Sequence, residues 1–281
     1  MRDRRQHGLL RKATAPPEGH GRAERDRDHI LIFGVHAVEA ALSNPRRNIR
    51  RLCLTDNAER RLRGALTGRQ ITHERVLPRD LDRRLGADVV HQGALVETEP
   101  LREPTLAEVA EGAGSRPLLM LDQVTDPHNV GAVLRSAAVF GAGGLVMTRR
   151  HSPPLDGALA KSASGALEHV PLVLVQNLAR AIADLRAQGV TVIGLDGEAT
   201  QGLEDMAWPA GVALVLGAEG KGLRQLTRES CDRLARIATD GTFASLNVSN
   251  AAAIALHWAA ATRLGLVAAG RSARDEPRPQ R

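Results

Sequence analysis

Residues 118–135, LLMLDQVTDPHNVGAVLR, contain a strand, a turn and the start of a helix in direct succession. The apolar run that opens the segment is typical of a strand covered on both faces of a sheet. Asp126-Pro127 indicates a turn, and we interpret Asn129 as the N-cap of the helix that follows. Arg135 lies six residues after Asn129, inside this helix. The segment therefore predicts a strand–turn–helix unit with polar side chains beyond the end of the strand.

The same order of strand and helix repeats through the second half of the chain. We expect strands at residues 118–122, 145–148, 170–175, 190–195, 212–216 and 234–238. We expect helices at residues 130–140, 155–164, 178–187, 223–231 and 249–264. This alternation predicts an α/β domain with a mostly parallel sheet covered on both faces. Ligands of such sheets bind at the carboxyl ends of the strands, where the candidate site residues should lie.

Composition divides the chain into five parts. Residues 29–99 are interpreted as a small α/β domain, residues 100–117 as a linker rich in Glu, Gly and Pro, and residues 118–268 as the main α/β domain. Residues 1–28 and 269–281 are polar, charged and without hydrophobic periodicity, which predicts disordered segments.

The net charge of +6 is concentrated at the two ends of the chain. Residues 1–28 hold eight basic and five acidic side chains, and residues 271–281 hold four basic and two acidic ones. The body is nearly neutral, so it should bind anions by local patches. Arginine makes up 35 of the 38 basic residues, which suits bidentate contact with phosphate, although the codon usage of a GC-rich genome explains the bias equally well. The aromatic content of 2% argues against a base-stacking platform.

Several classes of protein are excluded by the sequence. No apolar run approaches the roughly 18 residues of a membrane span, and the N-terminus lacks the apolar region of a secretory signal. Cys53 and Cys231 are far apart, which excludes a disulfide framework and indicates isolated buried thiols in a reducing cytoplasm. The ten histidines show no metal-ligand spacing, so we expect no metal site.

Two further clusters follow predicted strands. In residues 214–223, LVLGAEGKGL, three glycines surround Glu219, and glycines let a ligand approach the backbone closely. The spacing is not that of a phosphate-binding Walker loop. Residues 237–250, IATDGTFASLNVSN, form a polar loop that leads into a helix of small residues. Each cluster is also compatible with ordinary turn and cap chemistry, which we expect for Ser249. The glycines of residues 141–144 follow a helix, so we interpret them as a helix C-cap and turn.

Taken together, the three clusters resemble the motifs of the SPOUT superfamily, in its SpoU–TrmH branch of RNA 2′-O-ribose methyltransferases. The resemblance covers about residues 30–265 and rests on the N-x-x-x-x-x-R pattern of Asn129 to Arg135, the Gly-Ala-Glu-Gly loop and the later Ser-Leu-Asn-Val-Ser run. The first domain, with FGVHAV at residues 33–38 and HQG at residues 91–93, is similar to the substrate-binding domain of the bacterial 23S rRNA guanosine 2′-O-methyltransferases, an L30e/L7Ae-like RNA-binding domain.

The resemblance implies a deep trefoil knot in the C-terminal sheet domain, homodimerisation through that domain, S-adenosylmethionine as cofactor and a guanosine of 23S rRNA as substrate. By position, the catalytic residues would be Asn129, Arg135, Glu219, Ser245 and Asn247. The cofactor would contact Gly217, Ile237 and Leu246. The sequence departs from the family pattern at two positions. The family usually has proline where this chain has Ala238, and relatives often have a polar residue where it has Ala244. Both departures affect loop rigidity rather than the chemistry.

Other functions remain compatible with the sequence. The target could be tRNA or another rRNA site, or the chain could be a non-catalytic RNA-binding factor of ribosome assembly. Loss of Arg135, Glu219 or Asn247 would favour the last of these, but all three residues are present. Because guanidinium groups stay protonated in proteins, we expect Arg135 to stabilise negative charge rather than to act as a base.

Deletion of residues 1–28 tests whether this basic segment binds RNA. We expect the affinity for RNA to depend less steeply on salt, because each lost phosphate contact lowers the slope of log K against log salt by about 0.7. Filter binding of the full-length and shortened chains across a KCl series measures the slope. An unchanged slope would refute a binding role for the segment.

Overall fold

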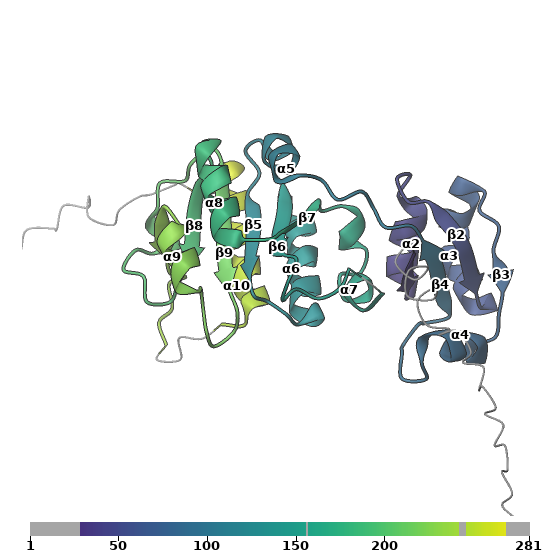
Figure 1. Ribbon diagram of the computed structural model, residues 1–281. Helices are drawn as coiled ribbons and strands as arrows, with labels where there is room; N and C mark the ends of the chain where they lie inside the picture. Colours follow the sequence, from purple (N-terminus) through teal and green to yellow (C-terminus); the bar gives the residue numbers. More distant parts are fainter. Residues whose placement is uncertain (1–28, 156, 242–245, 268–281) are drawn as a thin grey trace, which may run out of the picture.

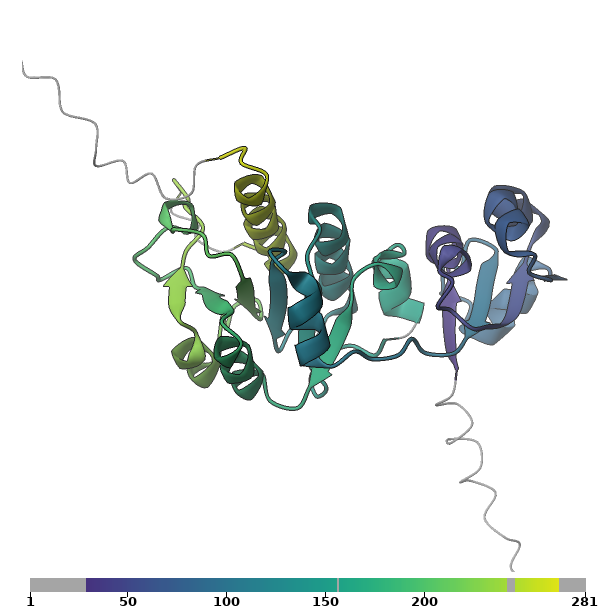
Figure 2. The same ribbon diagram turned by 90° about the horizontal axis from the view of Figure 1, so that it is seen from above.

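The computed structural model describes residues 29–155, 157–241 and 246–267, which fold into two lobes (Figure 1). The N-terminal lobe holds a four-stranded sheet, and the C-terminal lobe holds a six-stranded sheet. A connecting segment with one short helix runs between them (Figure 2). Over the described part of the chain, no helix has both the length and the apolar character to cross a bilayer.

The N-terminal domain is a mixed sheet with helices. Its elements are β1 (Ile30–Phe33), α2 (Val35–Ser43), β2 (Ile49–Leu54), α3 (Asp56–Arg69), β3 (Glu74–Arg75), α4 (Pro78–Leu85) and β4 (Ala94–Thr98). The strand order is β1-β4-β2-β3, with β4 antiparallel to both neighbours and β3 parallel to β2. Buried residues of α2 and α3, including Val38 and Leu62, pack with Ile32, Leu52 and Val96 of the strands to form its core.

The C-terminal domain is a parallel α/β sheet. Its strands are β5 (Leu118–Asp122), β6 (Gly144–Thr148), β7 (Leu172–Val175), β8 (Thr191–Leu195), β9 (Val212–Gly217) and β10 (Arg233–Ala235). Its helices are α5 (Leu106–Ala113), α6 (Pro127–Phe140), α7 (Gly157–Ser162), α8 (Leu178–Ala187), α9 (Gln225–Ser230) and α10 (Val248–Arg263), with short 3-10 turns η1 (Ala166–Glu168) and η2 (Leu203–Asp205). The strands lie in the order β10-β8-β9-β5-β6-β7, and every pair is parallel.

Alternate residues of the central strands supply two separate cores. Leu119 and Leu121 of β5 pack with α6 and α10 on one face. Leu118 and Met120 of β5 pack with α5 and α8 on the other. All five residues of β5 are buried, so the apolar run of this strand serves both faces. The predicted α/β class and the parallel sheet covered on both faces are confirmed.

The caps of α6 and α10 differ from the prediction. The N-cap of α6 is Asp126, whose carboxylate accepts a hydrogen bond of 3.0 Å from the His128 amide, and Pro127 occupies the first helical position, where its fixed φ is favourable. Asn129 therefore lies inside the first turn, and its side chain is available for other contacts. At α10 the N-cap is Asn247, not Ser249. The predicted C-cap at Gly141 is confirmed by its left-handed φ of 70°.

The segment interpreted as a linker contains helix α5. Thr105 and Glu108 form a capping box, with the Thr105 hydroxyl accepting from the Glu108 amide and the Glu108 carboxylate accepting from the Thr105 amide. Val109 and Ala113 are buried against the sheet. The helix is short and lies among Glu, Gly and Pro residues, so its periodicity was too weak to distinguish from a loop.

Close approach of the two domains depends on small residues of the segment from α7 to η1. A Cβ at Gly157 would overlap the ring of Phe33, and a Cβ at Gly165 would overlap the Cβ of Ala40. Ala160 of α7 belongs to the apolar core of the N-terminal domain. This part of the C-terminal lobe thus forms one wall of the N-terminal core.

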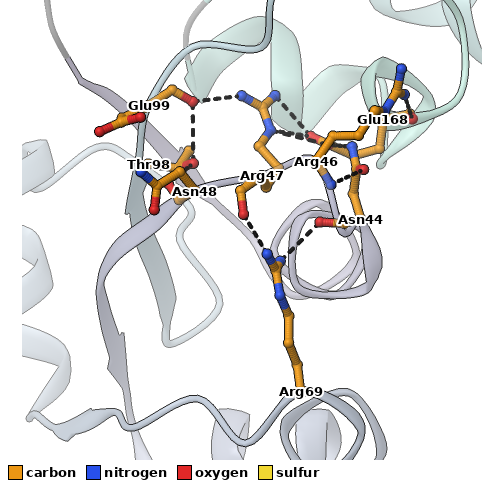
Figure 3. A network of polar contacts seen from close by, with 8 residues as sticks. All are labelled: Asn44, Arg46, Arg47, Asn48, Arg69, Thr98, Glu99 and Glu168. Carbon is orange, nitrogen blue, oxygen red and sulfur yellow. Dashed lines mark hydrogen bonds and ion pairs between the residues drawn. The ribbon is translucent and has the colours of Figure 1, made fainter.

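A buried ion pair fixes the same interface (Figure 3). Arg47, in the loop between α2 and β2, donates two hydrogen bonds of 3.0 Å from Nε and one of 2.9 Å from Nη2 to the carboxylate of Glu168 in η1. Asn44 Nδ2 donates to the same carboxylate at 2.6 Å. The side chains of Arg47 and Glu168 are each only 3% exposed. Arg69 in turn donates to the backbone carbonyls of Asn44 and Arg47.

Breaking this pair should destabilise the protein far more than breaking a surface pair. Glu168→Ala leaves a buried guanidinium without its carboxylate, so we expect the free energy of unfolding to fall by about 3–5 kcal/mol. In the matched control Arg50→Ala, an exposed pair with Glu99 is lost, and the expected change is below about 1 kcal/mol. Urea denaturation followed by circular dichroism measures both. Equal losses would contradict the structural role of the buried pair.

Candidate active site

Three polar side chains from distant parts of the chain meet at the carboxyl edge of the parallel sheet. Asn129 lies in the first turn of α6, Glu219 in the loop after β9, and Asn247 at the N-cap of α10. Asn129 Nδ2 donates to Glu219 Oε1 at 3.0 Å, and Asn247 Nδ2 donates to Asn129 Oδ1 at 3.0 Å and also to Glu219 Oε1. Three of the five predicted catalytic residues therefore form one hydrogen-bonded cluster.

Asn247 links this cluster to the helix behind it. Its Oδ1 accepts from the Ser249 amide at 2.9 Å and from the Ser249 hydroxyl at 2.5 Å. One side chain thus caps α10 with its oxygen and holds Asn129 and Glu219 with its nitrogen. Because the cap fixes the direction in which the amide nitrogen points, the start of α10 positions the cluster.

The loop that carries Glu219 turns back on itself at its glycines. The Gly222 amide donates to the Ala218 carbonyl at 2.9 Å. A Cβ at Gly217 would overlap the backbone of Gly222, so this close return requires glycine at position 217. Gly222 itself has a left-handed φ of 63°, which a side chain would disfavour.

A cavity of about 330 Å³ lies next to the cluster, beyond the carboxyl ends of β8 and β9 and beside the chain that leaves β10. The three predicted cofactor residues, Gly217, Ile237 and Leu246, all line it, as does Glu219. The volume lies within the range of small-molecule sites. The glycine-rich loop therefore borders the cavity, and the Glu219 side chain at its tip belongs to the amide–carboxylate cluster.

The cavity also has walls that the sequence analysis missed. Leu195 ends β8 and Asp196 follows it, and Arg236 and Thr239 follow β10. Asp196 is paired with Arg228, Nε to Oδ2 at 3.0 Å. Their positions just after strands were a usable signal, but without glycines or a cluster of polar residues they did not stand out.

S-adenosylmethionine fits the chemistry of this cavity. Leu195, Leu216, Ile237 and Leu246 supply apolar surface for a base, and Gly217 exposes backbone without a side chain. The carboxylate of Glu219 on the rim is suited to a ligand that carries positive charge. These features are consistent with a cationic sulfonium compound attached to an adenosine.

Arg135 does not join the cluster. Its side chain is exposed on α6, and it forms no hydrogen bond or ion pair with any residue that the structure describes. Six helical positions separate it from Asn129, which directs the two side chains to different sides of the helix. Ser245, the remaining predicted catalytic residue, lies outside the described residues, as does Ala244. Ala238 is exposed.

The cysteines lie away from this site. Cys53 is buried and Cys231 half-buried, and both are free thiols. Burial raises the pKa of the Cys231 thiol to about 12, so it stays protonated and unreactive at neutral pH. Within the described ranges, no three His, Cys, Asp or Glu side chains are grouped so that they could hold a metal ion.

The fold and the site define a class of two-domain α/β protein, with a small mixed-sheet domain and a parallel-sheet domain that holds a cofactor-sized cavity. Residues 116–257 match the family described as the SpoU rRNA Methylase family, and residues 31–104 match the domain described as RNA 2'-O ribose methyltransferase substrate binding. The chain belongs to the SpoU rRNA methylase family. The predicted membership of this methyltransferase family is confirmed.

Similar proteins cover more than four fifths of the chain. The 23S rRNA (guanosine-2'-O-)-methyltransferase RlmB of Vibrio vulnificus is 39% identical over 83% of this chain and 97% of its own. The protein of the same name from Photobacterium profundum is 41% identical over 83% of this chain and 98% of its own. The crystal structure of the SpoU methyltransferase AviRb from Streptomyces viridochromogenes in complex with the cofactor AdoMet has a TM-score of 0.72 and 25% identity, covering 87% of this chain and 94% of that one.

Replacement of Asn247 by serine separates its two roles. Serine is a good N-cap, but it is too short to reach both Asn129 and Glu219. We expect Asn247→Ser to change the free energy of unfolding by less than about 0.5 kcal/mol and to weaken S-adenosylmethionine binding about tenfold, the equivalent of one lost hydrogen bond. Urea denaturation and titration calorimetry measure the two effects. Unchanged cofactor affinity would show that the cluster does not position the loop.

Proposed function

We propose that this protein transfers a methyl group from S-adenosylmethionine to the ribose 2′-OH of a guanosine in 23S rRNA. The observation that carries the proposal is the match of about 40% identity to guanosine 2′-O-methyltransferases across both domains. The location would be the cytoplasm, where ribosomal RNA is modified in bacteria. The small N-terminal domain would select the RNA, and the parallel-sheet domain would carry out the transfer.

S-adenosylmethionine, when bound, supplies a methyl group that is already activated by its sulfonium. Gly217, Ile237 and Leu246 would hold it, because all three line the same cavity. The task left to the protein is to bring the ribose oxygen into line with this methyl group, and positioning of this kind lowers the barrier substantially. The cluster of Asn129, Glu219 and Asn247 would set the position of the loop that carries the cofactor.

Arg135 would act on the RNA rather than on the cofactor. Its guanidinium is exposed and has no partner among the described residues, so it is free to bind a phosphate next to the target ribose. From there its positive charge stabilises the negative charge that develops on the 2′ oxygen. Ser245, which lies outside the described residues, would contribute to substrate contact.

A homodimer through the C-terminal domain is part of the proposal. Helices α6 and α10 pack against one another. Val139 of α6 and Ile254 of α10 are exposed, with 78% and 39% of their surface accessible, and Leu264, directly after α10, is 61% exposed. Trp258 Nε1 and Thr262 Oγ1, one helical turn apart on α10, are buried and without a hydrogen-bond partner among the described residues. A second copy packed on these helices would cover the apolar side chains and could bring its Arg135 toward the site.

We also propose that the C-terminal domain forms the deep trefoil knot of its superfamily. Strand β10 lies at the edge of the sheet, outside β8. The chain leaving it pairs with the loop after β8, where the Arg236 amide donates to the Gln201 carbonyl at 2.9 Å. Residues 242–245 lie outside the described residues, and the chain is described again from Leu246 into α10, which packs on α6. The pairing of the chain after β10 with an earlier loop supports the proposal of a knot.

The function is tested by methyl transfer from labelled S-adenosylmethionine to unmodified 23S rRNA and, separately, to tRNA. The expected product is label in a 2′-O-methylguanosine of 23S rRNA, recognised by its alkali-resistant linkage. Label in tRNA alone would keep the chemistry and overturn the substrate. Cofactor binding without label in either RNA would favour a binding protein over an enzyme.

Replacement of Arg135 should remove transfer without affecting the cofactor. We expect Arg135→Ala to lower kcat about 10²–10³-fold, the usual effect of removing one group that stabilises developing charge, while the affinity for S-adenosylmethionine stays the same. Arg180→Ala is the matched control, because Arg180 is also an exposed helical arginine without a side-chain partner among the described residues. Single-turnover transfer and calorimetry measure the two quantities. A variant that keeps most of its turnover would remove Arg135 from the mechanism.

A further inference from the structure

A second cavity lies on the same edge of the parallel sheet as the cofactor cavity. It has a volume of about 260 Å³ and lies beyond the carboxyl ends of β5, β6 and β7. The cofactor cavity takes up the other half of the edge, beyond β8, β9 and β10. The end of β9 and the loop after it separate the two cavities. Residues 217–220 and Gly222 line the cofactor cavity, and Arg224 lines the second one.

The lining of this second cavity is polar and positively charged. Among the described residues that line it there is no carboxylate, whereas there are two arginines, one histidine, three amides and two threonines. The side chains that the argument uses are Gln123, Arg150, His151, Gln176, Asn177 and Arg224. Such a set can donate many hydrogen bonds to an anion, and it offers no negative charge to repel one.

Arg224 is held in place from behind. Its Nε donates to Asp122 Oδ1 at 2.7 Å, and its amide donates to Asp122 Oδ2 at 3.0 Å. Asp122 ends β5, and its side chain is fully buried. The two Nη nitrogens of Arg224 have no acceptor among the described residues. The buried carboxylate thus orients the guanidinium and leaves its outer edge free for a ligand.

Arg150 supplies a second free guanidinium. It follows β6, and its side chain forms no hydrogen bond or ion pair with the described residues. Its carbonyl accepts from the Thr148 hydroxyl at 2.5 Å, which fixes the turn. Gln123 and His151, both lining the cavity, have left-handed φ values of 58° and 63°. Non-glycine residues hold such conformations at a cost, and they concentrate at ligand-binding sites.

We propose that this cavity binds a phosphodiester group of the substrate RNA, between the guanidinium groups of Arg150 and Arg224. The proposal rests on the proposed function, since it concerns the same RNA. Planar guanidinium groups match phosphate oxygens in pairs. Because one edge of one sheet carries both cavities, a phosphate held here would anchor the strand whose target ribose lies beside the cofactor. The site would position RNA without reading its sequence.

The test is the salt dependence of RNA binding by the full-length chain. Binding of unmodified 23S rRNA is measured across a KCl series for the wild type, Arg150→Ala, Arg150→Lys and Arg180→Ala. Arg180 lies on α8 next to the cavity but does not line it. We expect the slope of log K against log salt to fall by about 0.7 in Arg150→Ala, one phosphate contact, and to stay at the wild-type value in the other two variants. The KM for RNA should rise several-fold in Arg150→Ala, with the KM for S-adenosylmethionine unchanged.

Two results would overturn the site. One is a slope in Arg150→Ala equal to that of the wild type, as expected if the cavity takes a free phosphate or nothing. The other is an equal loss in Arg180→Ala, which would indicate a diffuse positive surface. Binding does not require turnover, so this measurement stands apart from the proposed function. The expected difference in slope between the wild type and Arg150→Ala, found together with no methyl transfer by the wild type, would support the site and overturn the function.

Discussion

The buried contact of Arg47 with Glu168 determines how the two domains work together. A guanidinium and a carboxylate that are both 3% exposed have lost almost all of their hydration, and their mutual hydrogen bonds, with those of Asn44 to the carboxylate and of Arg47 to the Glu99 carbonyl, compensate for that loss. A small separation of the domains would break these hydrogen bonds and leave two unsatisfied charges away from water. The docked arrangement of the two domains is therefore more stable than one in which they have moved slightly apart. The glycines at positions 157 and 165 let the backbones approach closely enough for the pair to form. An RNA segment held by the N-terminal domain, as proposed, would therefore have a fixed direction relative to the parallel sheet.

The parallel sheet is the second constraint. Because all six strands run the same way, every loop that follows a strand emerges at one edge. Asn129, Glu219 and Asn247 are far apart in sequence, yet each belongs to a loop or first helical turn at that edge. The same geometry explains why two cavities lie side by side there, separated by the loop after β9. The core is formed by the apolar residues of the strands and helices. The loops after the strands contribute little to it, so their residues are available for binding and catalysis.

Much of this arrangement could be predicted from the sequence, and the limits are physical. The continuous apolar runs identified the buried strands, and their order with the helices identified the parallel sheet. The clusters around Asn129, Glu219 and Asn247 were visible because their polar residues directly follow strands. Caps were less accessible, since Asp126, Asn129 and Ser249 are all chemically suitable and only geometry selects among such candidates. The contact of Arg47 with Glu168 could not be predicted, because nothing local distinguishes either residue from the many surface charges of the chain.

The pairing of the arginines explains how a neutral body can still bind an anion. Many surface arginines have a carboxylate partner, as in Arg51 with Glu74, Arg75 with Glu59 and Arg186 with Asp232. Such pairs cancel the field of the body and contribute little to stability. Against that background, guanidinium groups without a partner at the carboxyl edge of the sheet are local sources of positive potential. Arg150, which follows β6, is of this kind among the described residues, whereas Arg135 is a guanidinium without a partner further along α6. Since much of the surrounding charge is balanced in pairs, the free guanidinium of Arg150 would draw an RNA strand toward the edge that holds the cofactor cavity, where the lining of the second cavity adds further donors.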